Sequence, residues 1–150
     1  MNTDNGIVIL MADDDHEDCM LAKEALEESR LANTMHFVHD GEELLDYLYA
    51  RGKYAPPAEV RRPGLILLDL NMPRMDGREA LAILKADEKL RRIPVVVLTT
   101  SKAEEDVYRS YDLGANSYIT KPVTFDSMVE LTRSLARYWF SIVLLPDESE

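Results

Sequence analysis

Residues 65–77 read LILLDLNMPRMDG, and this segment begins with four consecutive apolar residues that end at an aspartate. Such a run is expected in a strand that is covered on both faces, and VVVL at 95–98 repeats the pattern. Strands of this kind occur in parallel sheets whose crossover helices cover both faces. The segment therefore predicts an α/β protein.

Short apolar runs of strand type recur on both sides of this segment. The predicted strands are Ile7–Ala12, Met35–His39, Leu65–Asp69, Val95–Thr99 and Ser117–Ile119. Segments of helical period separate the strands. Their apolar faces carry Cys19, Ala22, Ala25, Leu26 and Ser29, then Leu44, Leu45 and Leu48, then Ala80, Leu81 and Leu84. Strands that alternate with helices predict a doubly wound, five-stranded parallel sheet with five helices.

The predicted helix at about Ala103–Asp112 has the weakest period, whereas Thr124–Phe140 reads as a strongly amphipathic final helix. The apolar positions of that final helix are Phe125, Met128, Val129, Leu131, Leu135 and Trp139. Residues 1–137 are expected to form one domain, and 138–150 a C-terminal extension that is first apolar and then acidic. The proline-rich segment Arg51–Gly64 is expected to be a long ordered loop rather than a domain linker.

The composition of the chain excludes some classes of function. The chain has 150 residues, a net charge of −11 and an apolar fraction of 46%. This charge argues against nucleic-acid binding, which depends on Lys and Arg. No apolar run reaches membrane-spanning length, so no membrane partner is expected. The single cysteine, Cys19, suits a reducing compartment and predicts a cytoplasmic location.

Polar residues follow the predicted strands where ligands bind in open α/β sheets, at the carboxyl ends. These residues are Asp13, Asp14, Asp15, Asp69, Asn71, Thr99 and Lys121. Carboxylates with a backbone carbonyl form a hard-oxygen Mg²⁺ site, and an aspartate can accept a phosphoryl group covalently. Asp15 has a second interpretation as the N-cap of the first helix, with Asp18 three residues on. His16, His36 and His39 lack metal-ligand spacing, and surface or strand roles are expected for them.

Four motifs in order, the acids after the first strand, LILLDLNMPRMDG, VVVLTTS and YITKP, together resemble the response-regulator receiver domain over about Ile7–Arg137. The resemblance implies the flavodoxin-like strand order 2-1-3-4-5. It implies that Asp69 is the phosphoacceptor and that Asp13, Asp14, Asp69 and the main-chain carbonyl of Asn71 bind Mg²⁺ or Mn²⁺, Asp13 through water. It assigns Thr99 and Lys121 to the phosphoryl oxygens, and Thr99 and Tyr118 to the conformational switch. A shift of one residue would exchange Asp15 for Asp13, and Tyr118 could instead be a core residue.

The implied function is that of a two-component response regulator, which accepts a phosphoryl group from a sensor histidine kinase and is not itself an enzyme. A narrower resemblance, in the long loop, RIPVVVLTTS and YWFSIVLLP, is to the single-domain regulators of phytochrome-type kinases. It implies a homodimer or partner surface at Tyr138, Trp139, Phe140 and Leu144, although the strip could pack within the chain. Two alternatives stay open. One is a Mg²⁺-dependent phosphohydrolase with an Asp nucleophile, which Asn71 disfavours because a second acid is expected there. The other is a phosphorylation-independent interaction domain.

Overall fold

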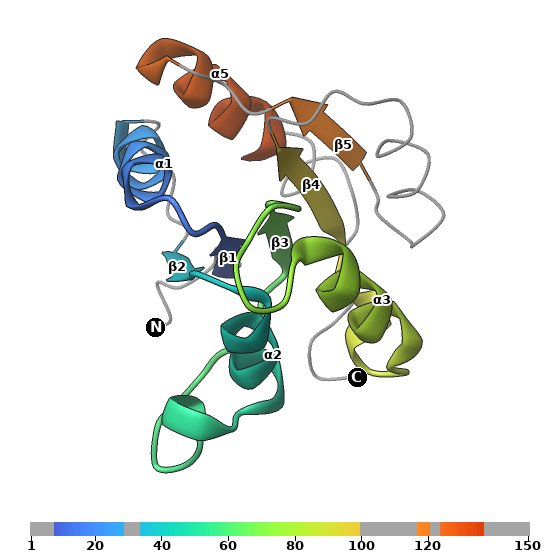
Figure 1. Ribbon diagram of the computed structural model, residues 1–150. Helices are drawn as coiled ribbons and strands as arrows, with labels where there is room; N and C mark the ends of the chain where they lie inside the picture. Colours follow the sequence, from blue (N-terminus) through green and yellow to red (C-terminus); the bar gives the residue numbers. More distant parts are fainter. Residues whose placement is uncertain (1–7, 29–33, 100–116, 121–123, 137–150) are drawn as a thin grey trace.

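The computed structural model describes residues 8–28, 34–99, 117–120 and 124–136. Its centre is a parallel sheet of five strands in the order β2-β1-β3-β4-β5. Figure 1 shows helices on both sides of this sheet. The strands are β1 (Val8–Ala12), β2 (Thr34–Val38), β3 (Leu65–Leu68), β4 (Val95–Thr99) and β5 (Ser117–Thr120). The predicted doubly wound sheet and its strand order are confirmed.

Three of the five strands end one residue away from the predicted position, namely β2, β3 and β5. β2 ends at Val38 because the next amide, that of His39, leaves the sheet and donates to the Glu43 carboxylate over 2.9 Å. β3 ends at Leu68 because the chain turns at Asp69, whose carboxylate accepts the amide N–H of Asn71. The polar side chains at these ends therefore act in turns and not as the last residues of strands.

Four α-helices lie within the described residues. They are α1 (His16–Glu28), α2 (Gly41–Tyr49), α3 (Gly77–Ala86) and α5 (Phe125–Ala136), with single 3-10 turns η1 (Gly52–Tyr54) and η2 (Leu90–Arg92). The helix predicted near Ala103–Asp112, the continuation of the final helix to Phe140 and the extension 138–150 lie outside the described part of the chain. No helix in the described ranges is long and apolar enough to cross a membrane.

Alternate residues of each central strand enter two different cores, as the pleat of a sheet covered on both faces requires. Leu10, Ile66 and Val97 join the core under α2 and α3, whereas Met11, Leu67 and Val96 join the core under α1 and α5. Figure 1 shows these two helix pairs on opposite sides of the sheet. Phe125 was expected on the apolar face of the final helix, but its side chain, in the first turn of α5, is 39% exposed. This part of the prediction is wrong.

The segment Arg51–Gly64 is an ordered loop, as predicted. The Tyr47 hydroxyl of α2 donates to the carbonyl of Arg61 over 2.9 Å, and the amide of Gly64 donates to the carbonyl of Val8 over 2.8 Å. The loop is therefore attached to α2 and to β1, and the second of these contacts lies directly before β3 begins.

Candidate metal-binding site at the carboxyl edge of the sheet

Three aspartates meet where β1 and β3 end. These strands are neighbours, and Ala12 pairs with Leu68, so the residues that follow them are brought side by side. Each of Asp13, Asp14 and Asp69 offers a carboxylate oxygen within 4.8 Å of the others; Asp13 and Asp69 are buried, and Asp14 is exposed. Like charges this close repel, and a divalent cation would offset the repulsion. Carboxylate oxygens are the ligands that Mg²⁺, Mn²⁺ and Ca²⁺ prefer, so this donor set fits such an ion.

Asp13 is held by hydrogen bonds to its main chain and to its side chain. Its amide donates to the carbonyl of Val38 over 3.0 Å, and its Oδ1 accepts the amide of Asp15 over 2.9 Å. Its own carbonyl accepts from the Cys19 thiol at 3.6 Å and from His39 Nδ1 at 3.1 Å. Three of these contacts hold the main chain of Asp13, and the fourth holds its buried carboxylate.

Asp69 is held from both sides of the turn that follows β3. Its amide donates to the carbonyl of Ala12 over 3.0 Å, and its Oδ1 accepts the amide of Asn71 over 3.1 Å. α3 begins against this turn: the amide of Gly77 donates to the carbonyl of Leu70, and a Cβ at Gly77 would lie 2.3 Å from the carbonyl oxygen of Asp69. Only glycine allows this approach.

Asp15 has a different role from its two neighbours. Its Oδ1 accepts the amides of Glu17 at 2.9 Å and Asp18 at 3.4 Å, immediately before α1 begins at His16. The predicted N-cap is confirmed. The structure places Asp13 and Asp14, rather than Asp15, beside Asp69.

The remaining expected site residues are placed only in part. Asn71 is exposed and follows Asp69 by two residues. Thr99 and Tyr118 belong to β4 and β5, and Thr99 pairs with Thr120, directly before Lys121 in the chain. The side chains of Thr99 and Tyr118 lie outside the described part of the structure, as do the residues Lys121, Tyr138, Trp139, Phe140 and Leu144.

The sequence of residues 9–133 matches the model of the response regulator receiver domain, which spans most of the chain. The chain belongs to the response-regulator receiver family. It is therefore a response regulator of two-component signalling. Proteins of this family are phosphoryl-accepting signalling proteins and not enzymes, and their partners are sensor histidine kinases.

Among receivers, this one is similar to regulators of phytochromes. It is 40% identical over 139 residues to the response regulator Rcp1 of Synechocystis sp., covering 93% of this chain and 92% of Rcp1. The crystal structure of the phosphorylated cyanobacterial phytochrome response regulator RcpA superposes with a TM-score of 0.86 at 42% identity, covering 95% of this chain and 99% of RcpA. The Mn²⁺-bound form of Rcp1 superposes with a TM-score of 0.84 at 40% identity, covering 94% of this chain and 99% of Rcp1.

One residue next to the acid cluster, which consists of Asp13, Asp14 and Asp69, has a position that the sequence analysis did not predict. His39 was expected at the surface or in a strand, but it lies just beyond β2, partly buried, with its ring against the carbonyl of Asp13. The two residues are 26 positions apart, and a main-chain carbonyl leaves no trace in residue type. No spacing pattern could therefore have revealed this contact.

Proposed function

We propose that Asp69 accepts a phosphoryl group from the phosphohistidine of a sensor histidine kinase. The observation that carries this proposal is the group of three carboxylates, two of them buried, at the carboxyl edge of the sheet. An Asp69 oxygen attacks phosphorus, the phosphorus–nitrogen bond breaks, and its electron pair returns to the imidazole of the kinase. Asp13, Asp14, Asp69 and the main-chain carbonyl of Asn71 would hold Mg²⁺, which neutralises phosphate charge and orients the donor when bound.

Lys121 and Thr99 complete the proposed site. The Lys121 ammonium offsets charge on the phosphoryl oxygens, and the Thr99 hydroxyl donates to one of them. Because the acyl phosphate offers a stronger acceptor than a free carboxylate, Thr99 moves toward it, and Tyr118 fills the space that Thr99 leaves. The functional result is a shift in population between two conformations that differ in their surface, and no chemical product is released.

The proposed kinase is of the phytochrome type, and the proposed output is contact with other proteins. The similarity to Rcp1 and to the phytochrome regulator RcpA supports this partner. The apolar residues Tyr138, Trp139, Phe140 and Leu144 are proposed to form a homodimer surface. The cytoplasmic location expected from the single cysteine suits such a partner.

Acetyl phosphate tests the phosphoacceptor directly. We expect the full chain with Mg²⁺ to gain one phosphoryl group by intact mass, and Asp69→Asn to gain none. Asp15→Asn is the matched control, since Asp15 caps α1, and it should be modified like the wild type. Rapid multiple turnover of small phosphate esters would instead indicate a phosphohydrolase. If neither Mg²⁺ nor a beryllofluoride mimic of the phosphoryl group changes the spectra of the protein, the chain would instead be a phosphorylation-independent interaction domain.

A further inference from the structure

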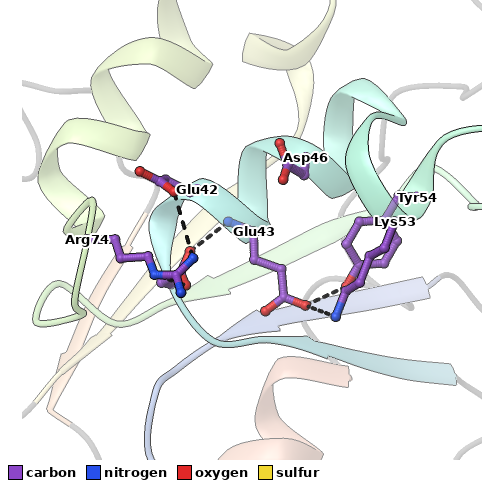
Figure 2. A pocket seen from close by; sticks show the side chains of 7 residues that line it. Glu42, Glu43, Asp46, Lys53, Tyr54 and Arg74 are labelled. Atoms are coloured by element: carbon purple, nitrogen blue, oxygen red, sulfur yellow. Dashed lines mark hydrogen bonds and ion pairs between the residues drawn. The ribbon is translucent and has the colours of Figure 1, made fainter.

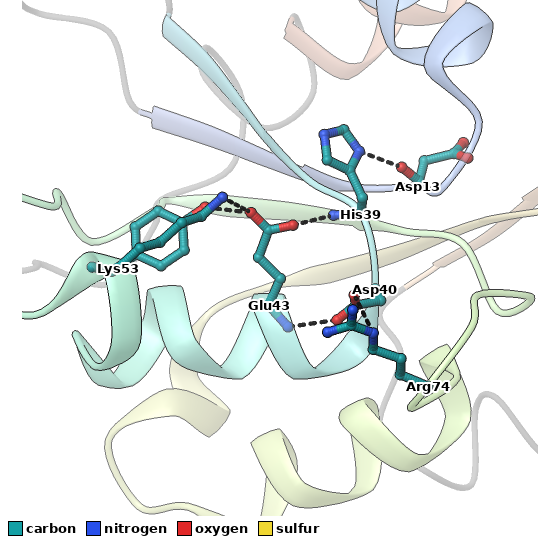
Figure 3. Close-up of polar contacts among 7 residues, drawn as sticks. Asp13, His39, Asp40, Glu43, Lys53 and Arg74 are labelled. Atoms are coloured by element: carbon teal, nitrogen blue, oxygen red, sulfur yellow. Dashed lines mark hydrogen bonds and ion pairs between the residues drawn. The ribbon is translucent and has the colours of Figure 1, made fainter.

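The side chain of His39 contacts the main chain of Asp13, one of the three acids of the cluster. Its Nδ1 lies 3.1 Å from the carbonyl oxygen of Asp13, and Figure 3 shows the ring directed at that carbonyl from the turn after β2. We propose that His39 is a positioning residue for the metal-binding acids, acting through the main chain of Asp13. This inference rests on the proposed function and assigns it a residue outside the acid cluster.

The hydrogen bond from His39 has a defined direction. A carbonyl oxygen can only accept, so Nδ1 carries the proton that the bond requires. The Cys19 thiol also donates to this oxygen, at 3.6 Å, and a thiol is a weak donor. His39 therefore supplies the stronger of these two side-chain contacts.

Small shifts of Asp13 matter because of what its carboxylate would bind. Mg²⁺ demands near-octahedral coordination by oxygen at short distances, so a displaced ligand weakens binding, whether it contacts the ion directly or through water. Groups that orient metal ligands commonly change metal affinity when they are replaced. The carboxylate of Asp13 is fully buried, so its position follows that of its main chain.

His39 is itself fixed through its main chain. Its amide donates to Glu43 Oε1 over 2.9 Å, and the other oxygen of that carboxylate accepts from the Tyr54 hydroxyl at 2.6 Å and from Lys53 Nζ at 2.9 Å. Figure 2 shows Lys53 and Tyr54 approaching Glu43 from the same side. Contacts therefore run without a break from η1, in the loop before β3, through Glu43 and His39 to Asp13.

A second ring packs against His39 from the first turn of α1. The His16 and His39 ring centroids are 4.7 Å apart, with the rings inclined at 48°. His39 thus contacts α1, the carbonyl of Asp13 and, through its amide, α2. The ring is therefore in contact with His16 and with the Asp13 carbonyl, and the main chain that carries it is held by Glu43.

His36 offers a matched control three residues earlier. Its Nδ1 lies 3.3 Å from the Tyr47 hydroxyl, and its ring meets the edge of Tyr47 at a centroid distance of 6.0 Å. His36 is also partly buried and precedes the same turn, so its replacement disturbs packing without removing the bond to Asp13.

The test compares His39→Phe, His39→Asn and His36→Phe in the full chain. Phenylalanine keeps a ring but has no donor, whereas the Asn amide places a nitrogen where Nδ1 stands. Mn²⁺ binding is measured by electron paramagnetic resonance, with Mg²⁺ as competitor, and acetyl phosphate modification is followed as a function of Mg²⁺. We expect His39→Phe to weaken metal binding roughly tenfold. His39→Asn should recover most of the affinity, His36→Phe should leave it unchanged, and the rate at saturating Mg²⁺ should change little in all three.

Two results would overturn the inference while the wild type still binds metal and accepts a phosphoryl group. One is wild-type metal affinity in His39→Phe, and the other is an Asn variant as weak as the Phe variant. If His39→Phe does not fold, as judged by circular dichroism, His39→Leu takes its place in the same comparison. A wild-type chain that binds no Mn²⁺ would contradict the proposed function itself, so the two failures are distinguishable.

Discussion

Gly77 sets how closely α3 approaches the turn that carries Asp69. A Cβ at this position would lie 2.3 Å from the Asp69 carbonyl oxygen and 2.8 Å from the Cα of Leu70, and both are main-chain atoms that cannot rotate away. Gly77→Ala should therefore destabilise the protein by about 3 kcal/mol and slow modification by acetyl phosphate, because Asp69 is displaced. Urea unfolding and intact mass are the measurements.

Gly52→Ala is the matched control for Gly77→Ala. Gly52 has φ of +62°, but a Cβ there would first meet a side-chain oxygen of Asp46 at 3.2 Å. The left-handed backbone opposes alanine at Gly52 at a cost of about 1 kcal/mol. The Asp46 carboxylate must also give way by a few tenths of an ångström, but it is a side chain that can move, so modification should continue at the wild-type rate. Equal losses in the two variants would contradict the steric role of Gly77.

Mutations in the run Asp13–Asp15 should show two different functions, one in helix capping and one in metal binding. Asp15→Ala removes the cap of α1 and should lower the free energy of unfolding by about 1 kcal/mol, with metal affinity retained. Asp14→Asn removes an exposed carboxylate of the cluster and should weaken Mn²⁺ binding, with stability retained or increased as repulsion falls. Paired measurements of urea unfolding and Mn²⁺ affinity check both. Loss of metal binding in Asp15→Ala would reverse the assignment.

At the scale of elements, Glu43 connects α2, the end of β2 and the loop 51–64. Burial raises the pKa of this carboxyl, but hydrogen bonds from Tyr54, Lys53 and the His39 amide outweigh burial, so its pKa lies below the ordinary 4.5. Burial and the bond to Glu43 raise the pKa of Tyr54, which therefore stays protonated as the donor. The ionised Glu43 side chain thus attaches η1 to α2, in addition to the bond from the Tyr47 hydroxyl to Arg61.

This attachment should depend on pH. The folded state favours ionised Glu43, so its contribution to stability is present above pH 4.5 and is lost as the pH falls through the lowered pKa. Glu43→Gln should therefore lower stability at pH 7 by about 1 kcal/mol, and the difference from the wild type should shrink in acid. Urea unfolding over this pH range is the measurement.

Glu42→Gln serves as the control on the same helix. Glu42 is exposed, and its ion pair with Arg74 is 3.9 Å long, so its replacement should change stability little at any pH. A pH-independent difference between the wild type and Glu43→Gln would show that the carboxylate charge does not hold the loop.

At the scale of the whole molecule, the C-terminal extension is expected to decide the oligomeric state. Apolar side chains cluster at Tyr138–Leu145, and small domains seldom expose such a strip without a partner. Deletion of Arg137–Glu150 should convert a concentration-dependent dimer into a monomer, as measured by light scattering during size-exclusion chromatography. Deletion of the acidic end alone, Asp147–Glu150, is the control and should leave the dimer intact. An unaltered mass after the longer deletion would remove the basis for this interface.

Much of the fold follows from local sequence because the apolar pattern is local. The runs at 8–12, 65–68 and 95–98 are apolar throughout, which requires cover on both faces and hence a parallel sheet. Chain order then brings Asp13, Asp14 and Asp69 to one edge, since parallel strands end together. The ends of β2 and β3 differ from the prediction, because the amide of His39 and the carboxylate of Asp69 form hydrogen bonds within the turns that follow these strands.

The sequence by itself determined the order of strands and helices, the acids that follow β1 and β3, and the cap at Asp15, since each depends on residues close together in the chain. Only the tertiary structure decided that His39 holds the Asp13 carbonyl and that Gly77 must lack a side chain. Both depend on main-chain atoms of other segments, whose positions no residue type encodes. Local patterns specify which groups reach the edge of the sheet, and packing specifies what holds those groups in place.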